Sequence, residues 1–339
     1  MAPKFRGKSD DWLDDQKSLR QSGKKNRQGK GIDAQAEELD LAEGSATVVE
    51  VFHKQSRVRP DGSNQEFLCS YRRAQVYQKG DLRERSPVAV GDRVKIQILS
   101  PQSGVIEGRC KRANSLARPA PDRHEKSIHI IAANVQVVAV VTSVSEPDFS
   151  MGIVDRFFAA AFMEKIPAIL IVNKTDLLEA EQGGHGTWRV YQDLGIPVFL
   201  VSSKKDTGID ELKAAVLGKT VVFCGHSGVG KSSLLANLIG KVVATTGTVN
   251  SYTGKGKHTT TSAVMFHTAG DSRWIDTPGV KEFGLSGVKP EDLAQAYPEF
   301  NGLACTQKSC FHFNEENCDA KTLARYPTYR RILESLLEE

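Results

Sequence analysis

One segment of the chain, Gly225 to Ser232 (GHSGVGKS), restricts the possible folds more than any other. It matches Gly-x-x-x-x-Gly-Lys-Ser and lies between a predicted strand (TVVFCG) and a predicted helix, where glycines allow the backbone to wrap around a phosphate. The dipole of the helix points at that phosphate, Lys231 would neutralise its oxygens, and the Ser232 hydroxyl would ligate Mg²⁺. The segment predicts a nucleoside triphosphate site that includes Gly225, His226, Ser227, Gly228, Val229, Gly230, Lys231, Ser232 and Ser233.

A second motif, Asn173 to Asp176 (NKTD), comes before this loop, whereas base-recognition segments usually follow it. The Asp176 carboxylate can accept hydrogen bonds from guanine N1–H and the 2-amino group, and adenine offers neither donor there. Asn173 is expected at the O6/N7 edge, and the Lys174 stem on the plane of the base. A backbone N–H of the segment VSSKK (201–205) is expected to support O6. The predicted base-binding residues are Asn173, Lys174, Thr175, Asp176, Ser202, Ser203 and Lys204, and they predict GTP over ATP.

The metal-anchoring and switch segments follow the phosphate loop. In WIDTPG, Asp276 is expected to hold Mg²⁺ through water, and the Gly279 N–H to contact the γ-phosphate. The polar segment GKGKHTTTS (254–262) is interpreted as a switch loop. One of its threonines would reach Mg²⁺ and the γ-phosphate, and the sequence does not decide which of Thr259, Thr260 and Thr261 does so.

Catalysis of hydrolysis needs a group that positions water. Val280 stands where many small GTPases have a glutamine, and valine cannot orient water by hydrogen bonding. His258, beside the threonines, is the candidate, with Lys231 and Thr260 as the other predicted catalytic residues; alternatively, His258 only packs against or caps the loop. Slow intrinsic turnover, accelerated by a large partner, is therefore expected.

Five apolar runs between residues 128 and 285 indicate a mostly parallel sheet covered by helices, a doubly wound α/β fold. Such a sheet gathers its ligand-binding loops at the carboxyl ends of its strands, whatever order the chain visits them. The order base reader, phosphate loop, switch, metal anchor is therefore a circular permutation of the usual GTPase order.

Residues 45–118 form a predicted second domain. Short β segments such as ATVVEVF and DRVKIQIL, separated by Gly and Pro, indicate an OB-like β-barrel, and an SH3-like barrel is the alternative. The cations in and near it favour RNA binding over a merely solvated face. They are Arg72, Arg73, Arg83, Arg85, Arg109, Lys111, Arg112, Arg118 and Arg123.

Cysteines are concentrated near the C-terminus. The segment CTQKSCFHFNEENC presents Cys305, Cys310, His312 and Cys318, a set that suits one tetrahedral, structural Zn²⁺. The following helix carries Arg325, Arg330 and Arg331 with Tyr326 and Tyr329, and is either an RNA-facing surface or an ordinary solvated helix. The predicted domains are a flexible basic arm (1–44), the barrel (45–118), the permuted domain (119–285) and a zinc-binding α domain (286–339).

Composition excludes some classes of protein. No apolar run reaches the roughly 18 residues that span a bilayer, and the polar N-terminal segment does not look like a signal peptide. The segment 1–31 carries nine Lys/Arg and four Asp, so the arm is expected either to touch RNA or only to aid solubility. A cytoplasmic monomer without a membrane partner is expected.

Together, NKTD, GHSGVGKSS, GKGKHTTT, WIDTPGVKEFGL and the Cys/His segment resemble the bacterial family of small-ribosomal-subunit-dependent, circularly permuted GTPases. The resemblance covers about residues 45–339. It implies a late assembly or checkpoint factor that binds small-subunit rRNA and hydrolyses GTP when the subunit stimulates it. Two alternatives stay open at this point: an RNA-binding switch whose turnover is incidental, and a permuted GTPase acting on another RNA particle.

Overall fold

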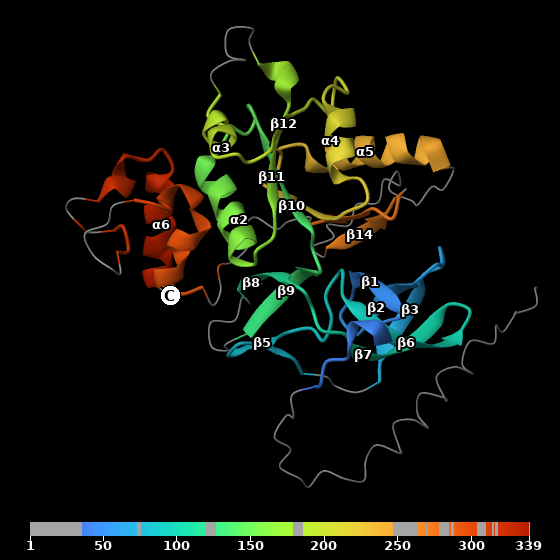
Figure 1. Ribbon diagram of the computed structural model, residues 1–339. Helices are drawn as coiled ribbons and strands as arrows, with labels where there is room; N and C mark the ends of the chain where they lie inside the picture. The colour runs from blue at the N-terminus through green and yellow to red at the C-terminus, as the bar shows by residue number, and fades with distance from the viewer. Residues whose placement is uncertain are drawn as a thin grey trace, which may run out of the picture. The chain divides into compact units, whose positions relative to one another are not determined.

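A computed structural model describes most of the chain from residue 36 onward (Figure 1). The described residues are 36–72, 76–119, 127–178, 186–246, 263–268, 270–277, 285, 288–303, 310–313, 315 and 318–338, with only the backbone for 241–246. Most of the predicted basic arm lies outside these ranges. The residue bounds predicted for the domains stay predictions.

The first part of the fold is a five-stranded closed barrel, which confirms the sequence prediction. Its strands pair in the order β1, β2, β3, β7, β6, and β6 returns to β1. Valines from three strands and an isoleucine fill the interior, each fully buried: Val48, Val58, Val94 and Ile106. The strands span Ala46–Val51 (β1), Gln55–Pro60 (β2), Phe67–Tyr71 (β3), Arg93–Ser100 (β6) and Ser103–Arg109 (β7), after a 3₁₀ turn at Leu41–Glu43.

A small second sheet lies outside the barrel, and it was not predicted from the sequence. Its order is β4, β5, β9, β8, with bounds Gln78–Lys79 (β4), Leu82–Glu84 (β5), Ser127–Ala133 (β9) and Ser115–Pro119 (β8). Ile128 and Ile130 of β9 pack with Ala89 on one face of the sheet. Because side chains alternate along a strand, His129 between them faces the other way. The first part of the range 128–285, up to Ala133, therefore belongs to this sheet rather than to the parallel one.

The remaining strands form the predicted doubly wound sheet, in the order β12, β11, β10, β13, β15, β14. All neighbours are parallel except β14, which runs antiparallel to β15. The bounds are Val137–Ser143 (β10), Ala168–Asn173 (β11), Val198–Leu200 (β12), Thr220–Gly225 (β13), Val264–His267 (β14) and Arg273–Asp276 (β15).

Helices cover both faces of this sheet. Phe157 and Phe158 of α2 (Met151–Met163) and Tyr191 of α3 (Arg189–Asp193) belong to the core on one face. Leu212 of α4 (Ile209–Val216) and Leu235 of α5 (Lys231–Thr246) belong to the core on the other. The alternate residues of β10 point to the two cores, which explains why all seven of them are buried.

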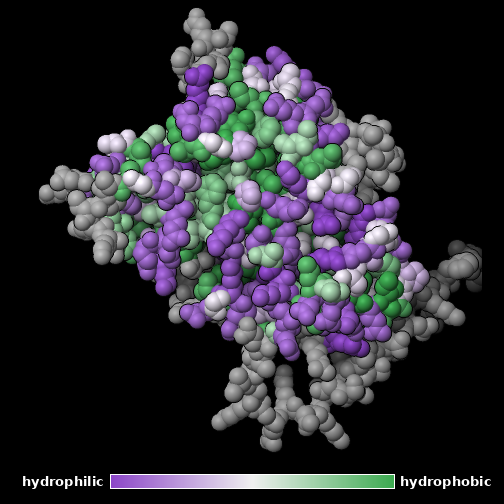
Figure 2. Space-filling view, viewed as in Figure 1, coloured by the Kyte–Doolittle hydropathy of each residue, from purple (hydrophilic) through white to green (hydrophobic). Residues whose placement is uncertain are grey.

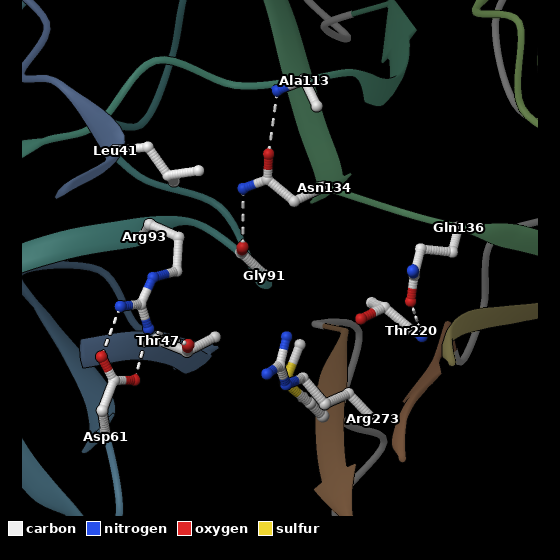
Figure 3. Close-up of a pocket in the computed structure, with 11 residues that line it drawn as sticks. Leu41, Thr47, Asp61, Gly91, Arg93, Ala113, Asn134, Gln136, Thr220 and Arg273 are labelled. Carbon is white, nitrogen blue, oxygen red and sulfur yellow. Dashed lines mark hydrogen bonds and ion pairs between the residues drawn. The ribbon is translucent and has the colours of Figure 1, made fainter. Parts of the chain in front are cut away.

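The barrel and the parallel sheet meet where β1 pairs with β14, at Glu50 and Val264. Beside this pairing lies a cavity of about 500 Å³ (Figure 3). Arg93 lines it from the barrel side and forms an ion pair of 2.5 Å with Asp61, and Arg273 lines it from β15. The two domains therefore share one continuous set of strand hydrogen bonds.

The C-terminal region is mostly helical, as predicted. It contains short 3₁₀ segments at Pro290–Ala296, Pro298–Phe300 and Asp319–Thr322 and ends with α6 (Tyr326–Leu337). The prediction that Arg325, Tyr326 and Tyr329 face outward is wrong, because all three are buried. Arg325 Nε donates to Asp155 of α2 at 2.8 Å, and its Nη1 lies 3.1 Å from Glu299, so this arginine anchors the region to α2.

The exterior is mainly hydrophilic, with local apolar areas (Figure 2). One such area lies over the β6–β7 hairpin, where Ile98 and Leu99 are exposed. Among the described residues, no helix has the length and apolar character needed to cross a bilayer.

Candidate functional site

The carboxyl ends of β13 and β11 bring the phosphate loop and the NKTD motif into direct contact. Asn173, the last residue of β11, donates from Nδ2 to the Val229 carbonyl at 3.0 Å and accepts from the Ser203 N–H at 3.0 Å. A Cβ at Gly230 would lie 2.5 Å from Asn173 Nδ2, so glycine is required for this approach. Three predicted segments thus converge on one buried amide.

Asp176 lies in the 3₁₀ turn Thr175–Leu177 that follows β11. The Ser202 hydroxyl donates to its Oδ1 at 2.6 Å and, as the largest cause, lowers the pKa of the carboxyl below its usual value. Lys204 is exposed and adds to this lowering by charge attraction. The carboxylate is therefore ionised and available to accept two hydrogen bonds.

Lys174 and Thr175 hold this turn in place. Lys174 has φ 62°, in the left-handed region, and its ammonium donates to the Glu146 carbonyl. The Thr175 N–H donates to Val201 at 3.2 Å. The sequence motifs gave no signal for the Glu146 contact, nor for Asn237, whose Nδ2 donates to the Ser203 carbonyl at 2.6 Å.

The phosphate loop ends where α5 begins, at Lys231. Lys231 forms a buried ion pair with Asp276, the last residue of β15. Ser232 and Ser233 are exposed in the first turn of α5, as are His226 and Ser227 earlier in the loop, whereas Val229 is buried. A cation, a carboxylate, a hydroxyl and a helix N-terminus therefore gather where a triphosphate and its metal are expected.

The donor set at this point fits Mg²⁺, which prefers oxygen ligands and usually binds through one or two protein groups plus phosphates. Asp276 supplies a carboxylate and Ser232 a hydroxyl. The predicted switch residues His258, Thr259, Thr260 and Thr261, and also Gly279, lie outside the described residues.

The predicted zinc ligands Cys310, His312 and Cys318 come together, with their ligand atoms within 4.8 Å of one another. His312 Nδ1 lies 3.2 Å from Cys318 Sγ and 3.5 Å from Cys310 Sγ. A tetrahedral ion with bonds of about 2.3 Å to sulfur and 2.0 Å to nitrogen separates such atoms by roughly 3.5 Å, so the residues fit zinc. The fourth predicted ligand, Cys305, lies outside the described residues.

Burial affects the titration of this cluster. It raises the pKa of the Cys310 thiol to about 12 and lowers the pKa of the His312 imidazole. The uncharged thiol and imidazole are therefore favoured until a cation compensates the thiolates, which is the behaviour of a metal site rather than of a reactive cysteine.

Comparisons with known proteins agree with this geometry. Residues 109–286 match the family model described as RsgA GTPase. A small ribosomal subunit biogenesis GTPase RsgA from Chlorobaculum tepidum is 37% identical over 74% of this chain and 86% of its own length. A relative from Bacteroides thetaiotaomicron, RsgA 2, is 34% identical over 75% of this chain and 85% of its own.

Solved structures are similar as well. YjeQ from Thermotoga maritima aligns with a TM-score of 0.66 and 27% identity, covering 87% of this chain and 98% of that one. YloQ, described as a circularly permuted GTPase, aligns with a TM-score of 0.61, covering 86% of this chain and 94% of that one, and its 24% identity supports the fold alone.

Proposed function

Because the chain belongs to the RsgA family of GTPases, we propose that it hydrolyses GTP to GDP and phosphate on the small ribosomal subunit, as a late assembly or checkpoint factor. It binds small-subunit rRNA, and hydrolysis releases it or another factor from the particle. The observation that carries the proposal is the convergence of Asn173, Val229 and Ser203, which unites a guanine-reading motif with a phosphate loop.

In this proposal each residue of the predicted nucleotide site has a role. Asp176 accepts from guanine N1–H and the 2-amino group, and Lys174 packs along the base. Lys231 leaves Asp276 to neutralise the phosphates, and the N–H groups from Gly228 to Ser233 surround them. His258 positions the attacking water, and one threonine of the switch (Thr259, Thr260 or Thr261) contacts the γ-phosphate, with Thr260 as the candidate catalytic residue.

Two metals accompany this activity. Ser232 and Asp276 would hold Mg²⁺, which neutralises charge on the triphosphate when it is bound. Cys305, Cys310, His312 and Cys318 would hold one structural Zn²⁺. We place the protein in the cytoplasm as a monomer, where small subunits are assembled.

The test is GTP turnover by purified protein with and without isolated small subunits. We expect slow turnover alone and strong stimulation by the subunit. Wild-type turnover that is fast alone and indifferent to subunits would contradict the proposal. His258→Ala should abolish stimulated turnover while leaving GTP binding intact.

A further inference from the structure

The barrel arginines divide into two groups with opposite surroundings. Arg109 and Arg112, both predicted from sequence as RNA-facing, pair with Glu84 at 2.6 Å and 2.9 Å, and only 2% and 8% of their side chains are exposed. Arg112 also pairs with Asp92 at 2.6 Å. These guanidinium groups are committed to carboxylates inside the protein, so the RNA-binding role predicted for them is wrong.

The neighbours of Glu84 along β5 face the other way. Because side chains alternate along a strand, Arg83 and Arg85 point to the outer face of the small sheet when Glu84 points inward. Arg83 pairs in register with Ser127 of β9, and both arginines are exposed. Arg85 Nε lies 3.4 Å from the Ser127 hydroxyl.

Two more nitrogen-bearing side chains continue this face. Arg118 of β8 stands directly opposite His129 of β9 in the antiparallel register. The pKa of His129 is lowered, first by burial and then by the charges of Arg118 and Arg85, so the three side chains lie close together. Arg83, Arg85, His129 and Arg118 therefore form one surface across three strands, which we call the outer arginine face.

Arg83 and Arg118 differ from Arg109 and Arg112 in their charged neighbours. Within the described part of the chain, neither Arg83 nor Arg118 forms an ion pair. Arg118 Nε is moreover shielded from solvent and has no hydrogen-bond partner there. An unsatisfied guanidinium N–H beside other cations is costly unless an external anion compensates it.

We propose that the outer arginine face binds the sugar–phosphate backbone of small-subunit rRNA, as a site separate from the five-stranded barrel. Guanidinium forks match phosphate geometry, and two strand spacings of about 4.8 Å separate Arg118 from Arg83 and Arg85, which suits contact with more than one phosphate. The half-buried, uncharged His129 ring can stack on an unpaired base. This inference rests on the proposed function, because it names a surface by which that function reaches rRNA.

The test compares two triple variants that each remove three positive charges. One is Arg83→Gln/Arg85→Gln/Arg118→Gln. The matched control, Arg189→Gln/Lys213→Gln/Lys219→Gln, removes cations from α3, α4 and the turn before β13. Binding to isolated small subunits and to protein-free small-subunit rRNA is titrated between 50 and 200 mM salt.

Each phosphate contact contributes about 0.7 to 0.9 to the slope of log affinity against log salt, so we expect the outer-face variant to lose about 2 from that slope with both probes. Its affinity at the lowest salt should fall by about tenfold or more, with GTP binding unchanged. Replacing the same three residues by Lys should restore the slope. Equal slopes for the outer-face variant and the control would overturn the site.

A slope that changes with intact subunits but not with free rRNA would assign the face to an acidic protein instead. If the variant fails to fold, the proposal is tested by chemical modification of wild-type protein. Bound small subunits should protect Arg83 and Arg85 from an arginine-specific dicarbonyl reagent. Modification that is equal with and without subunits would reject the proposal. If wild-type protein does not bind small subunits at all, the proposed function is rejected. If wild-type protein binds and the outer-face variant shows the same salt dependence as the control variant, only the proposed RNA site is rejected.

Discussion

The nucleotide site and the Cys/His cluster are held in place by different means. Asn173, Asp276 and Gly225 are terminal residues of buried strands, and the side chains of Asn173 and Asp276 already have partners within the protein. Cys310, His312 and Cys318 lie outside regular helices and strands, and His312 Nδ1 contacts both sulfur atoms. The first site is shaped by sheet packing, whereas the second is a group of side chains that is compatible with a zinc ion.

The largest effect is expected at the base reader. Asp176→Asn should lower GTP affinity by about three to four powers of ten and favour xanthosine nucleotides, because the amide no longer matches the donors of guanine. Fluorescent-nucleotide titration measures this. Since the sheet shapes the site, the variant should keep the wild-type melting temperature. A large drop in melting temperature would contradict the statement that sheet packing shapes the nucleotide site.

Removal of the cluster ion comes next. Cys318→Ala should abolish zinc binding, and loss of zinc present at 1,000 times its Kd removes about 4 kcal/mol of stability. Metal analysis measures the loss of zinc, and the protease sensitivity of the C-terminal region measures the loss of stability. Cys69→Ala, which removes a buried barrel thiol, is the control and should retain one zinc. GTP affinity that collapses together with zinc would show that the two sites are not independent.

The buried arginine between the two regions should have a smaller effect. Arg325→Met leaves Asp155 buried without its cation, which we expect to cost about 3 kcal/mol in the free energy of unfolding. Adding Asp155→Leu to Arg325→Met should recover part of the lost free energy of unfolding, because the unpaired carboxylate is then removed. Arg330→Met, which removes an exposed ion pair with Glu334, should cost less than about 0.5 kcal/mol in the same denaturant titration.

The smallest effect concerns the pH dependence of stability and strand β14 alone. Burial, with Arg59 and Arg273 nearby, lowers the pKa of His267 on β14 to about 4. The unfolded chain then binds a proton near pH 6.5 that the folded chain does not bind until about pH 4, so stability should fall as pH decreases through this window. We expect about 2 kcal/mol, allowing for partial exposure. His267→Gln should remove this part of the pH dependence, and an unchanged profile would contradict it.

The nucleotide motifs and the barrel could be predicted because short segments carry their signals. Strand β2 was not predicted, because QSRVRP is mostly polar and only two of its side chains are buried in the barrel. The small sheet escaped because β5 has three residues and pairs with β9, more than forty residues later. Sequence could not separate Arg109 from Arg83 either: both are arginines in β segments, and only the position of Glu84 decides which faces solvent.

The permuted order also has a consequence during synthesis. Strand β10 pairs with β11 on one side and with β13 on the other, and β13 is translated about eighty residues later. Until then, a strand whose seven residues are all buried in the folded protein has no hydrogen-bonding neighbour on that side. A nascent chain of this architecture is therefore expected to pass through a stage with an unpaired strand edge at the centre of its future sheet, and such an edge favours aggregation.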